Sequence, residues 1–424
     1  MKKFLAAVIA ATTVLGVGAS AKTIQVSIDS PDVYTDDEYI MKSTLEAAPY
    51  IENDITMVPL RFVTESLGAG VQWNDETKEV TITKGEETVV LQIGNINAIA
   101  VKGGESTTTQ LLAAPVIVND ITLVPLRFIS ENLGAYVEYV GPSRQVLISD
   151  EAPAVVVGNS PVFGSVFRAY YLLNSDAVGY YGEETVAEMV YNTLVSSAAV
   201  AENWKMINPY TGYSEELMAE INSVSDDELA TGGILKASYV KLLQIFSIEE
   251  EAVDMLMGSV NEEDILAAYD EQFVCAKHIL ISTVDSETGE PKADAAKIKK
   301  NAEAVLKKAK NGTDFDKLIK EYGEDPGMET NPDGYVFTKG EMVQSFEEAA
   351  FALKEDEISG LVESEYGYHI IKKMPLPEIS EEIEISLRYT LANEMLSQLS
   401  KSMSVVNNKT VEELAEYMIQ SSVG

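Results

Sequence analysis

The chain's single cysteine and one of its two histidines lie three positions apart, and both kinds of side chain can do chemistry. Cys275 and His278 fall in "CAKHILIS", and the other histidine, His369, falls in "YGYHIIKK". A thiolate and an imidazole that converge can form a nucleophilic dyad or supply two ligands of a metal site. Either chemistry requires a local backbone that lets the two side chains meet.

The apolar run around Cys275 is predicted to be a β-strand. Side chains alternate between the two faces of a strand, so His278 shares a face with Val274, Ala276 and Leu280, while Cys275 points the opposite way. This geometry argues against a Cys-x-x-His metal corner and against a Cys–His dyad. A single cysteine also cannot form a disulfide within the chain, so Cys275 is predicted to be an ordinary buried thiol.

The neighbouring elements predict a small domain over residues 273–374, in the order β-α-α-α-β. "AKIKKNAEAVLKKAKNG" has apolar residues at helical spacing, and "TDFDKLIKEY" is predicted to be a second helix that Thr313 opens. Ser345 and Glu348 are predicted to form a capping box for a third helix, and "YGYHIIKK" is predicted to be a closing strand. The two histidines are therefore expected on two strands of one sheet.

Several motifs in this segment resemble the parvulin-type peptidyl-prolyl cis-trans isomerases. They are "AKHILI", "EDPG", "FTKGEMVQSFEEAAFALKEDEISG" and "YGYHIIK", in this order. The resemblance implies an FKBP-like α+β domain with an antiparallel sheet, and isomerisation of X-Pro bonds without a cofactor. With helices before and after this domain, the chain is similar to extracytoplasmic foldases of the PrsA and SurA kind.

The resemblance also implies roles for individual residues. His278 and His369 match the paired histidines on neighbouring central strands, Asp325 matches a Cys or Asp position that faces them, and Ser364 matches a nearby hydroxyl; these four are the predicted catalytic residues. The predicted substrate-binding residues are Met342 and Phe346, which match the residues that hold the proline ring, together with Tyr335 and Tyr366. Where many members have a Gly-Gly-Asp-Leu-Gly loop, this chain has "NPDGYVF", so an apolar wall is missing unless Tyr335 supplies it.

Two other interpretations of the histidines stay open. They can be a buried pair that only stabilises the fold, or they can bind a metal ion with Asp325 as a third ligand. The prediction adopted is that no metal is bound.

A tandem duplication precedes the helical part of the chain. Residues 47–73, "AAPYIENDITMVPLRFVTESLGAGVQW", are nearly repeated at residues 113–139, "AAPVIVNDITLVPLRFISENLGAYVEY". Pro59 and Pro125 suit the start of a short helix and glycines its end, and alternating segments that follow predict hairpins. Each copy is therefore predicted to be a small α+β module.

The "NDITxVPLRF" core resembles the bacterial module called copper amine oxidase N-terminal-like, over about residues 24–149. This module occurs on exported, envelope-associated proteins, which implies a cell-wall polymer as a possible partner of the repeats. Copper sites use imidazole or thiolate ligands, and neither His nor Cys occurs between Lys22 and Val274. A copper site in the repeats is therefore excluded.

Residues 151–272 are predicted to form a helical, chaperone-like domain, and the helices of residues 375–424 are predicted to pack back on it. Thr410 and Glu413 are expected to form a capping box in this last segment. Methionines such as Met189, Met206 and Met255 either line an adaptable surface for unfolded chains or fill the helical core.

The N-terminus predicts export. Lys2 and Lys3 precede an apolar run and an A-x-A site, which is typical of a signal peptide over residues 1–21. No later run is apolar over the length of a membrane span. The formal charge of −37 repels nucleic acid and anionic lipid, so nucleic acid is excluded as a partner.

The overall prediction is a multidomain α+β protein with the repeats over residues 22–150. It is predicted to be an extracytoplasmic foldase, secreted or associated with the cell surface or wall, that isomerises X-Pro bonds in unfolded or extended secreted proteins. The alternative is a chaperone or wall-attached peptide-binding protein with a degenerate parvulin domain. Measurable isomerase activity distinguishes the two.

Overall fold

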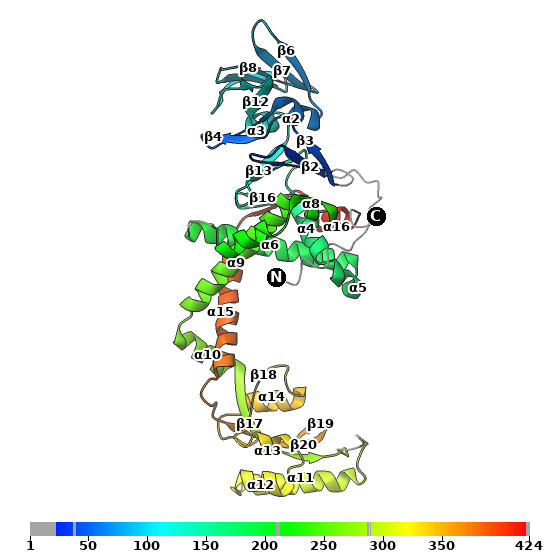
Figure 1. Cartoon of the computed structure of the whole chain (residues 1–424). Coiled ribbons are helices and arrows are strands. Elements are labelled where there is room, and N and C mark those ends of the chain that lie inside the picture. Colours follow the sequence, from blue (N-terminus) through cyan, green and yellow to red (C-terminus); the bar gives the residue numbers. More distant parts are fainter. Residues whose placement is uncertain (1–22, 37–39, 209–212, 286–287, 289, 421–424) are drawn as a thin grey trace. The chain divides into compact units, whose positions relative to one another are not determined.

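The structure is a computed structural model that describes residues 23–36, 40–208, 213–285, 288 and 290–420. The predicted signal peptide lies outside these residues. The chain divides into two compact units, which are described separately: Met1–Asp254 with Met395–Gly424, and Met255–Glu394 (Figure 1). No helix in the described part of the chain has the length and hydropathy needed to span a membrane.

The duplication appears in the first unit as two matching series of elements. The first series is β1 (Thr23–Ser27), β2 (Asp32–Asp36), β3 (Ile40–Thr44), β4 (Tyr50–Glu52), β5 (Ile55–Pro59), α2 (Leu60–Ser66), β6 (Gly70–Asn74) and β7 (Glu79–Lys84). The second is β8 (Glu87–Gln92), β9 (Asn97–Lys102), β10 (Glu105–Gln110), β11 (Val116–Val118), β12 (Ile121–Pro125), α3 (Leu126–Asn132), β13 (Tyr136–Val140) and β14 (Gln145–Ser149). Gly68 and Gly134, which follow the helices, adopt positive φ angles, as their predicted role at the helix ends requires.

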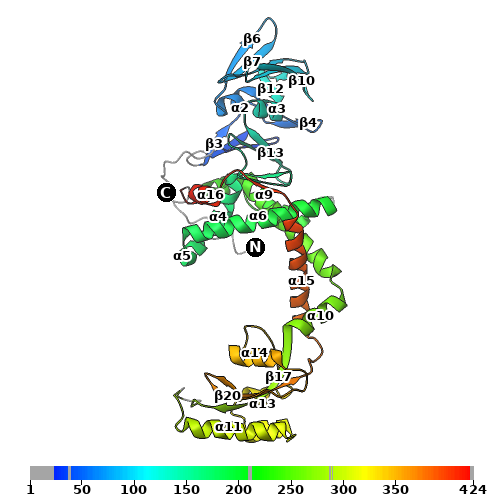
Figure 2. The ribbon, with the colours of Figure 1, turned by 180° about the vertical axis from the view of Figure 1, so that it is seen from behind.

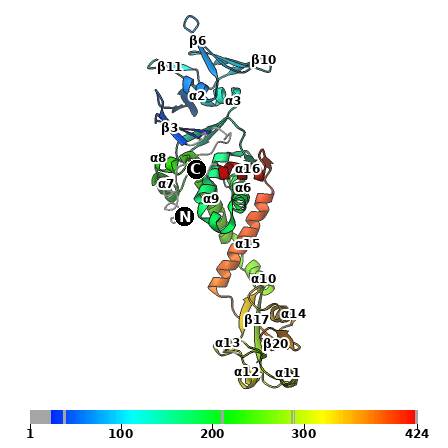
Figure 3. The ribbon, with the colours of Figure 1, turned by 90° about the vertical axis from the view of Figure 1, so that its right-hand side faces the viewer.

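The two copies have the predicted α+β content, and they interlock. One sheet has the order β13-β14-β1-β2-β3 and another β10-β9-β8-β7-β6, so each combines strands of both copies. A third sheet, β11-β12-β5-β4, joins the copies through Val58 opposite Val124. Helices α2 and α3 lie side by side (Figure 3), and one buried apolar cluster contains residues of both copies. Because β1 pairs with β14, the first copy depends on the last strand of the second.

Helices dominate the rest of this unit. They are α4 (Gly164–Leu173), α5 (Val178–Tyr181), α6 (Glu183–Ile207), α7 (Glu215–Asn222), α8 (Asp226–Thr231) and α16 (Val411–Gln420), with most of α9 (Lys236–Ser259) and a 3-10 turn at Ser175–Ala177. A small sheet of β15 (Val155–Val157), β16 (Ser160–Val162) and β21 (Val405–Asn407) pairs the C-terminal segment with the start of the helical region. Helix α16 packs on α4 and α6, and Thr410 and Glu413 form the predicted capping box before it.

The methionines of the helical region are not all core residues. Met189 is 51% exposed, Met206 73% and Met255 55%. Of the two predicted roles, an accessible surface fits these three side chains and a core-filling role does not.

The second unit is built on an antiparallel sheet of order β18-β17-β20-β19. Its strands are β17 (Phe273–Ser282), β18 (Tyr335–Thr338), β19 (Val362–Ser364) and β20 (Gly367–Met374), and its helices are α10 (Glu262–Gln272), α11 (Ala295–Lys310), α12 (Phe315–Tyr322), α13 (Gly327–Thr330), α14 (Gln344–Ala352) and most of α15 (Glu381–Lys401). Figure 2 shows α11 and α14 on opposite sides of the sheet, each over its own apolar cluster. The predicted order of strands and long helices is confirmed, with the short α13, β18 and β19 added.

Two helix starts differ from the predictions. Asp314, rather than Thr313, caps α12, because its carboxylate accepts from the backbone N–H of Lys317 at 2.8 Å. Helix α14 begins at Gln344, so Ser345 already lies inside it and cannot form the predicted capping box.

Candidate functional site

The sheet brings the two histidines together. In the antiparallel pair β17–β20, His278 lies opposite Ile371 and Leu280 lies opposite His369, so the histidines occupy diagonal positions on one face. Their Nδ1 atoms are 3.1 Å apart, and their rings are nearly parallel, with centroids 5.3 Å apart. Both side chains are buried.

A line of hydrogen bonds runs through this pair, and its direction follows from Asp325. An ionised carboxylate can only accept, so His278 Nε2 donates to Asp325 Oδ2 at 2.6 Å. In the uncharged pair, His278 Nδ1 then accepts from His369 Nδ1. His369 Nε2 is left to accept from the hydroxyl of Ser364, 2.6 Å away. The four predicted catalytic residues therefore lie in one continuous line.

The surroundings favour these charge states. Burial and the neighbouring His278 lower the pKa of His369 to about 4. The hydrogen bond from His278, with further ones from the Gly327 backbone and Tyr335, lowers the pKa of Asp325 to about 2 despite partial burial. The site therefore holds one ionised carboxylate and a neutral His369 at pH 7.

Apolar and aromatic side chains enclose the pair on its α14 side. The ring of Phe346 meets both imidazoles edge-on, at 5.1 Å from His278 and 5.4 Å from His369 between centroids. Met342, which is half-buried, packs in the same apolar cluster as Phe346. The arrangement keeps a line of polar groups against a largely apolar wall.

Tyr335 makes a polar contact in this site. Its hydroxyl donates to Asp325 Oδ2 at 2.8 Å, and burial together with this bond raises its pKa above the ordinary value. Its ring lies 5.9 Å from that of His278. The hydroxyl fits because Gly327 has no side chain: a Cβ there would lie 1.9 Å from the Tyr335 oxygen.

Tyr366 contributes through its backbone. Its N–H donates to Ser364 Oγ at 3.2 Å, and its carbonyl accepts from Ser282 Oγ at 3.1 Å. Its side chain is 49% exposed.

Cys275 lies on the other side of the strand, as the alternation of side chains predicts. Its sulfur lies 3.6 Å from the carbonyl oxygen of Asp333, and burial raises the pKa of its thiol. Lys277, which shares that face, pairs with Asp316 of α12. The prediction of an ordinary buried thiol is confirmed.

Two neighbours of the site were not predicted. Gly327 donates its backbone N–H to Asp325 Oδ1 at 2.9 Å, and the Met328 sulfur accepts from the backbone N–H of His278 at 3.5 Å. The "EDPG" motif contains Gly327, but only the folded chain places it under Tyr335. Within the described ranges, no group of three or more His, Cys, Asp or Glu side chains is arranged to hold a metal ion.

Two family models match separate parts of the chain. The model described as "PPIC-type PPIASE domain" matches residues 278–375. The model described as "Copper amine oxidase N-terminal domain" matches residues 34–148.

Curated relatives match about half of the chain. It is 35% identical over 233 residues to "Foldase protein PrsA" of Halalkalibacterium halodurans, which covers 50% of this chain and 64% of the relative, slightly under two thirds. It is also 35% identical over 227 residues to "Foldase protein PrsA" of Geobacillus kaustophilus, covering 49% of this chain and 72% of the relative. Among solved structures, peptidylprolyl isomerase (PrsA) from Bacillus cereus matches with a TM-score of 0.30 and 23% identity, over 57% of this chain and 91% of that one.

Proposed function

The chain belongs to the PrsA foldase family, and from this membership we propose that it is an exported foldase whose residues 273–374 catalyse cis–trans isomerisation of X-Pro bonds. The observation that carries the proposal is the contact between the two buried imidazoles, in line with Asp325 and Ser364, against the ring of Phe346. No cofactor or metal takes part in the proposed reaction.

The reaction needs an environment rather than a nucleophile. Rotation about an X-Pro bond crosses a barrier of about 18 to 20 kcal/mol and takes tens of seconds or longer without a catalyst. The planar amide is charge-separated by resonance, and the twisted state is less so, so a dry apolar pocket disfavours the planar form. A millionfold acceleration corresponds to roughly 8 kcal/mol.

Each residue has a proposed role in that environment. Met342 and Phe346 hold the proline ring, with Tyr366 at the exposed margin. His278, His369, Asp325 and Ser364 form the rigid polar floor. Tyr335 closes the floor by its bond to Asp325, and its ring, 5.9 Å from that of His278, is proposed to supply the apolar wall expected from the family loop.

The helical region, residues 151–272 with 375–424, is proposed to hold unfolded clients. Exposed Met189 and Met206 on α6 support this role, since methionine adapts to varied apolar partners. If the parvulin domain only gripped peptides, the protein would be a chaperone without isomerase activity, which is the second candidate.

The remaining parts of the proposal concern location and partners. The predicted signal peptide supports a secreted or surface location, with unfolded or extended secreted proteins as clients. Residues 22–150, the interlocked repeats, are proposed to attach the protein to a cell-wall polymer. The division of the chain into these domains is part of the same proposal.

A proline-peptide assay with full-length variants tests the activity. Wild type should isomerise the peptide, and His369→Ala and Met342→Ala should each lower kcat/KM at least tenfold. Cys275→Ala serves as the matched control, since this buried side chain of the same strand faces away from the histidines. Equal rates in all four proteins would refute the site, and suppression of client aggregation by a wild type without isomerase activity would favour the chaperone.

A further inference from the structure

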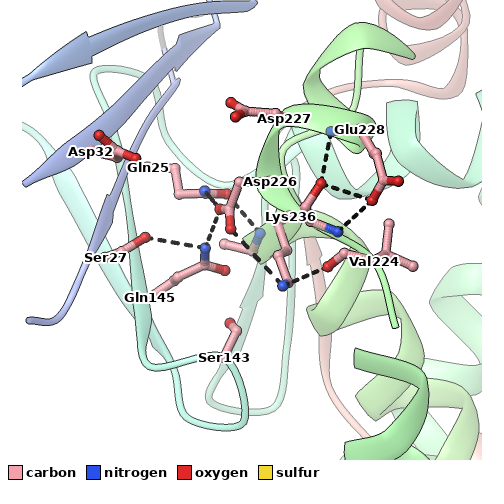
Figure 4. Close-up of polar contacts among 12 residues, drawn as sticks. Gln25, Ser27, Asp32, Ser143, Gln145, Val224, Asp226, Asp227, Glu228 and Lys236 are labelled. Atoms are coloured by element: carbon pink, nitrogen blue, oxygen red, sulfur yellow. Dashed lines mark hydrogen bonds and ion pairs between the residues drawn. The ribbon is translucent and has the colours of Figure 1, made fainter. Parts of the chain in front are cut away.

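A pocket in the first unit lies where the repeats meet the helical region. It has a volume of about 390 Å³ and is lined among others by Ser27, Ser143, Gln145, Met218, Asp226 and Lys236. This volume falls within the range of about 300 to 1,000 Å³ that is usual for small-molecule sites. Figure 4 shows its polar side chains, which come from β1, β2, β14 and the turn before β14 on one side, and from the starts of α8 and α9 on the other.

The orientation of the buried amides in this pocket is determined by one backbone donor. The N–H of Ala237 donates to Gln25 Oε1 at 2.7 Å, so the NH₂ group of Gln25 faces Asp226 and donates to Oδ1 at 2.6 Å. Gln145 must also present its NH₂ group to this carboxylate oxygen, 2.5 Å away, and the same group donates to Ser27 Oγ at 3.2 Å. The carbonyl oxygen of Gln145 therefore turns away from Asp226.

That carbonyl oxygen is an acceptor without a donor. Gln145 is only 2% exposed, and in the described part of the chain its Oε1 has no hydrogen-bond partner. In Figure 4 it points toward the space between Lys236 and Ser143. An unsatisfied buried acceptor is unfavourable, and a donor on a ligand can satisfy it.

Lys236 supplies a donor to the same space. Its ammonium group donates to the carbonyl of Val224 at 2.7 Å and lies 3.9 Å from Asp226 Oδ2. An ammonium group carries three N–H bonds, so it can also donate to a ligand. The pocket thus combines a lone acceptor, a cationic donor and an apolar wall that includes Met218 and Ile221.

We propose that this pocket binds a neutral saccharide unit. A sugar hydroxyl both donates and accepts, so one hydroxyl can donate to Gln145 Oε1 while its neighbour accepts from Lys236. The N–H of an acetamido group can also donate to Gln145 Oε1. The apolar face of a sugar ring fits against Met218. Asp32 and Asp226 in the lining, and the charge of −37 on the whole chain, disfavour phosphorylated or carboxylated ligands.

The pocket would be the place where the protein binds the proposed wall polymer. The choice of sugars for the test rests on that proposed function. The pocket is independent of the proposed isomerase site, which lies in the other unit. The two proposals can therefore fail separately.

Saturation-transfer NMR titrations of the full chain with N-acetylglucosamine, its β-linked dimer and glucose test the site. Wild type should show saturable binding to at least one of these sugars. Ser143→Trp, which fills the pocket, and Lys236→Met, which removes the ammonium group, should each weaken that binding at least tenfold. Ser106→Trp is the matched control, because Ser106 is exposed on β10 outside the pocket lining, and it should bind like wild type.

The contradicting outcomes are distinct. Absence of saturable sugar binding to wild type overturns the assignment, and so does full binding by both Ser143→Trp and Lys236→Met when thermal unfolding shows them folded. A proline-rich extended peptide that binds wild type but not Ser143→Trp, while none of the sugars bind, would identify a client site instead. Wild type that sediments with isolated cell wall but binds none of the sugars would overturn the pocket and leave wall attachment standing.

Discussion

At the scale of single residues, the hydrogen-bonded line from Ser364 to Asp325 makes acid the condition that disturbs this site. His369 has its pKa lowered from 6.5 to about 4, so its stabilising contribution is complete above pH 6.5 and is lost as pH falls toward 4. Asp325 has its pKa lowered from 3.8 to about 2, so its contribution is complete above pH 3.8 and is lost as pH falls through 2. Both pKa shifts therefore make the folded state less stable in acid than at neutral pH.

The low pKa of His369 can be observed directly because the chain contains only two histidines. In an NMR titration of histidine-labelled full-length protein, the His369 signal is the imidazole signal that is absent from His369→Gln. It should show that the His369 ring is still neutral at pH 5.5. Its midpoint should lie near pH 4, since protonation would place a charge in a buried site beside His278. A midpoint near 6.5 for that signal would show that the ring is exposed and not part of the buried line.

Gly327 and Tyr335 provide a second test at this scale. Gly327→Ala should destabilise the domain by about 1–3 kcal/mol, because the new Cβ would displace the Tyr335 hydroxyl and leave Asp325 short of a donor. Protection of the site amides in hydrogen exchange measures the loss. Tyr335→Phe removes the donor without a clash, so Gly327→Ala should cost much less in the Tyr335→Phe background than in wild type. Equal losses of stability in both backgrounds would show that the requirement for glycine at position 327 does not depend on the Tyr335 hydroxyl.

The sequence predicts part of this residue-scale picture. Strand alternation separates Cys275 from His278, and the family motifs point to Asp325 and Ser364. The role of Gly327 could not be predicted, since it depends on a close approach by Tyr335 from another element.

At the scale of elements, the repeats owe their stability to strands exchanged between the copies. Val58 and Val124 lie opposite each other in β5 and β12, and both are fully buried. Val124→Asp should cost more than 3 kcal/mol and unfold both copies together, because it buries a charge where the copies join. Thermal unfolding followed by circular dichroism measures the effect. Val118→Asp is the control on the exposed edge strand β11, and it should lower the midpoint of thermal unfolding by only a few degrees. If Val124→Asp unfolds one copy and leaves the other folded, the two copies are independent modules.

The helix starts show where local sequence is informative. The box of Thr410 and Glu413 forms as predicted, because α16 begins immediately after Thr410. The box predicted from Ser345 and Glu348 does not form, because α14 begins at Gln344 and Ser345 already lies inside the helix. The spacing of residues is the same in both cases, so the residue at which the helix begins decides between them. Likewise, the repeats are visible in the sequence, but the pairing of β1 with β14 joins distant segments that no local pattern links.

At the scale of the whole molecule, catalysis and client holding are assigned to different parts of the chain. Met189→Gln with Met206→Gln should weaken suppression of client aggregation about threefold or more, because it makes the exposed surface of α6 more polar. The rate on a short proline peptide should stay unchanged, since that substrate needs only the parvulin domain. Light scattering and the peptide assay on the same samples measure both.

The control for this prediction is Leu112→Gln, which removes an apolar side chain of the repeats that is more exposed than either methionine. Leu112 is 89% exposed. If Leu112→Gln weakens suppression as much as the double methionine variant, client holding is a general property of the surface and not of α6.

The most direct test of the central claim is NMR exchange spectroscopy of a short X-Pro peptide with the full-length protein between pH 4 and 8. A neutral His369 in a dry pocket predicts a catalysed cis–trans rate that falls as His369 is protonated toward pH 4, and that disappears in His369→Ala while Cys275→Ala keeps it. A rate that does not fall toward pH 4, or one that His369→Ala leaves intact, would contradict the account.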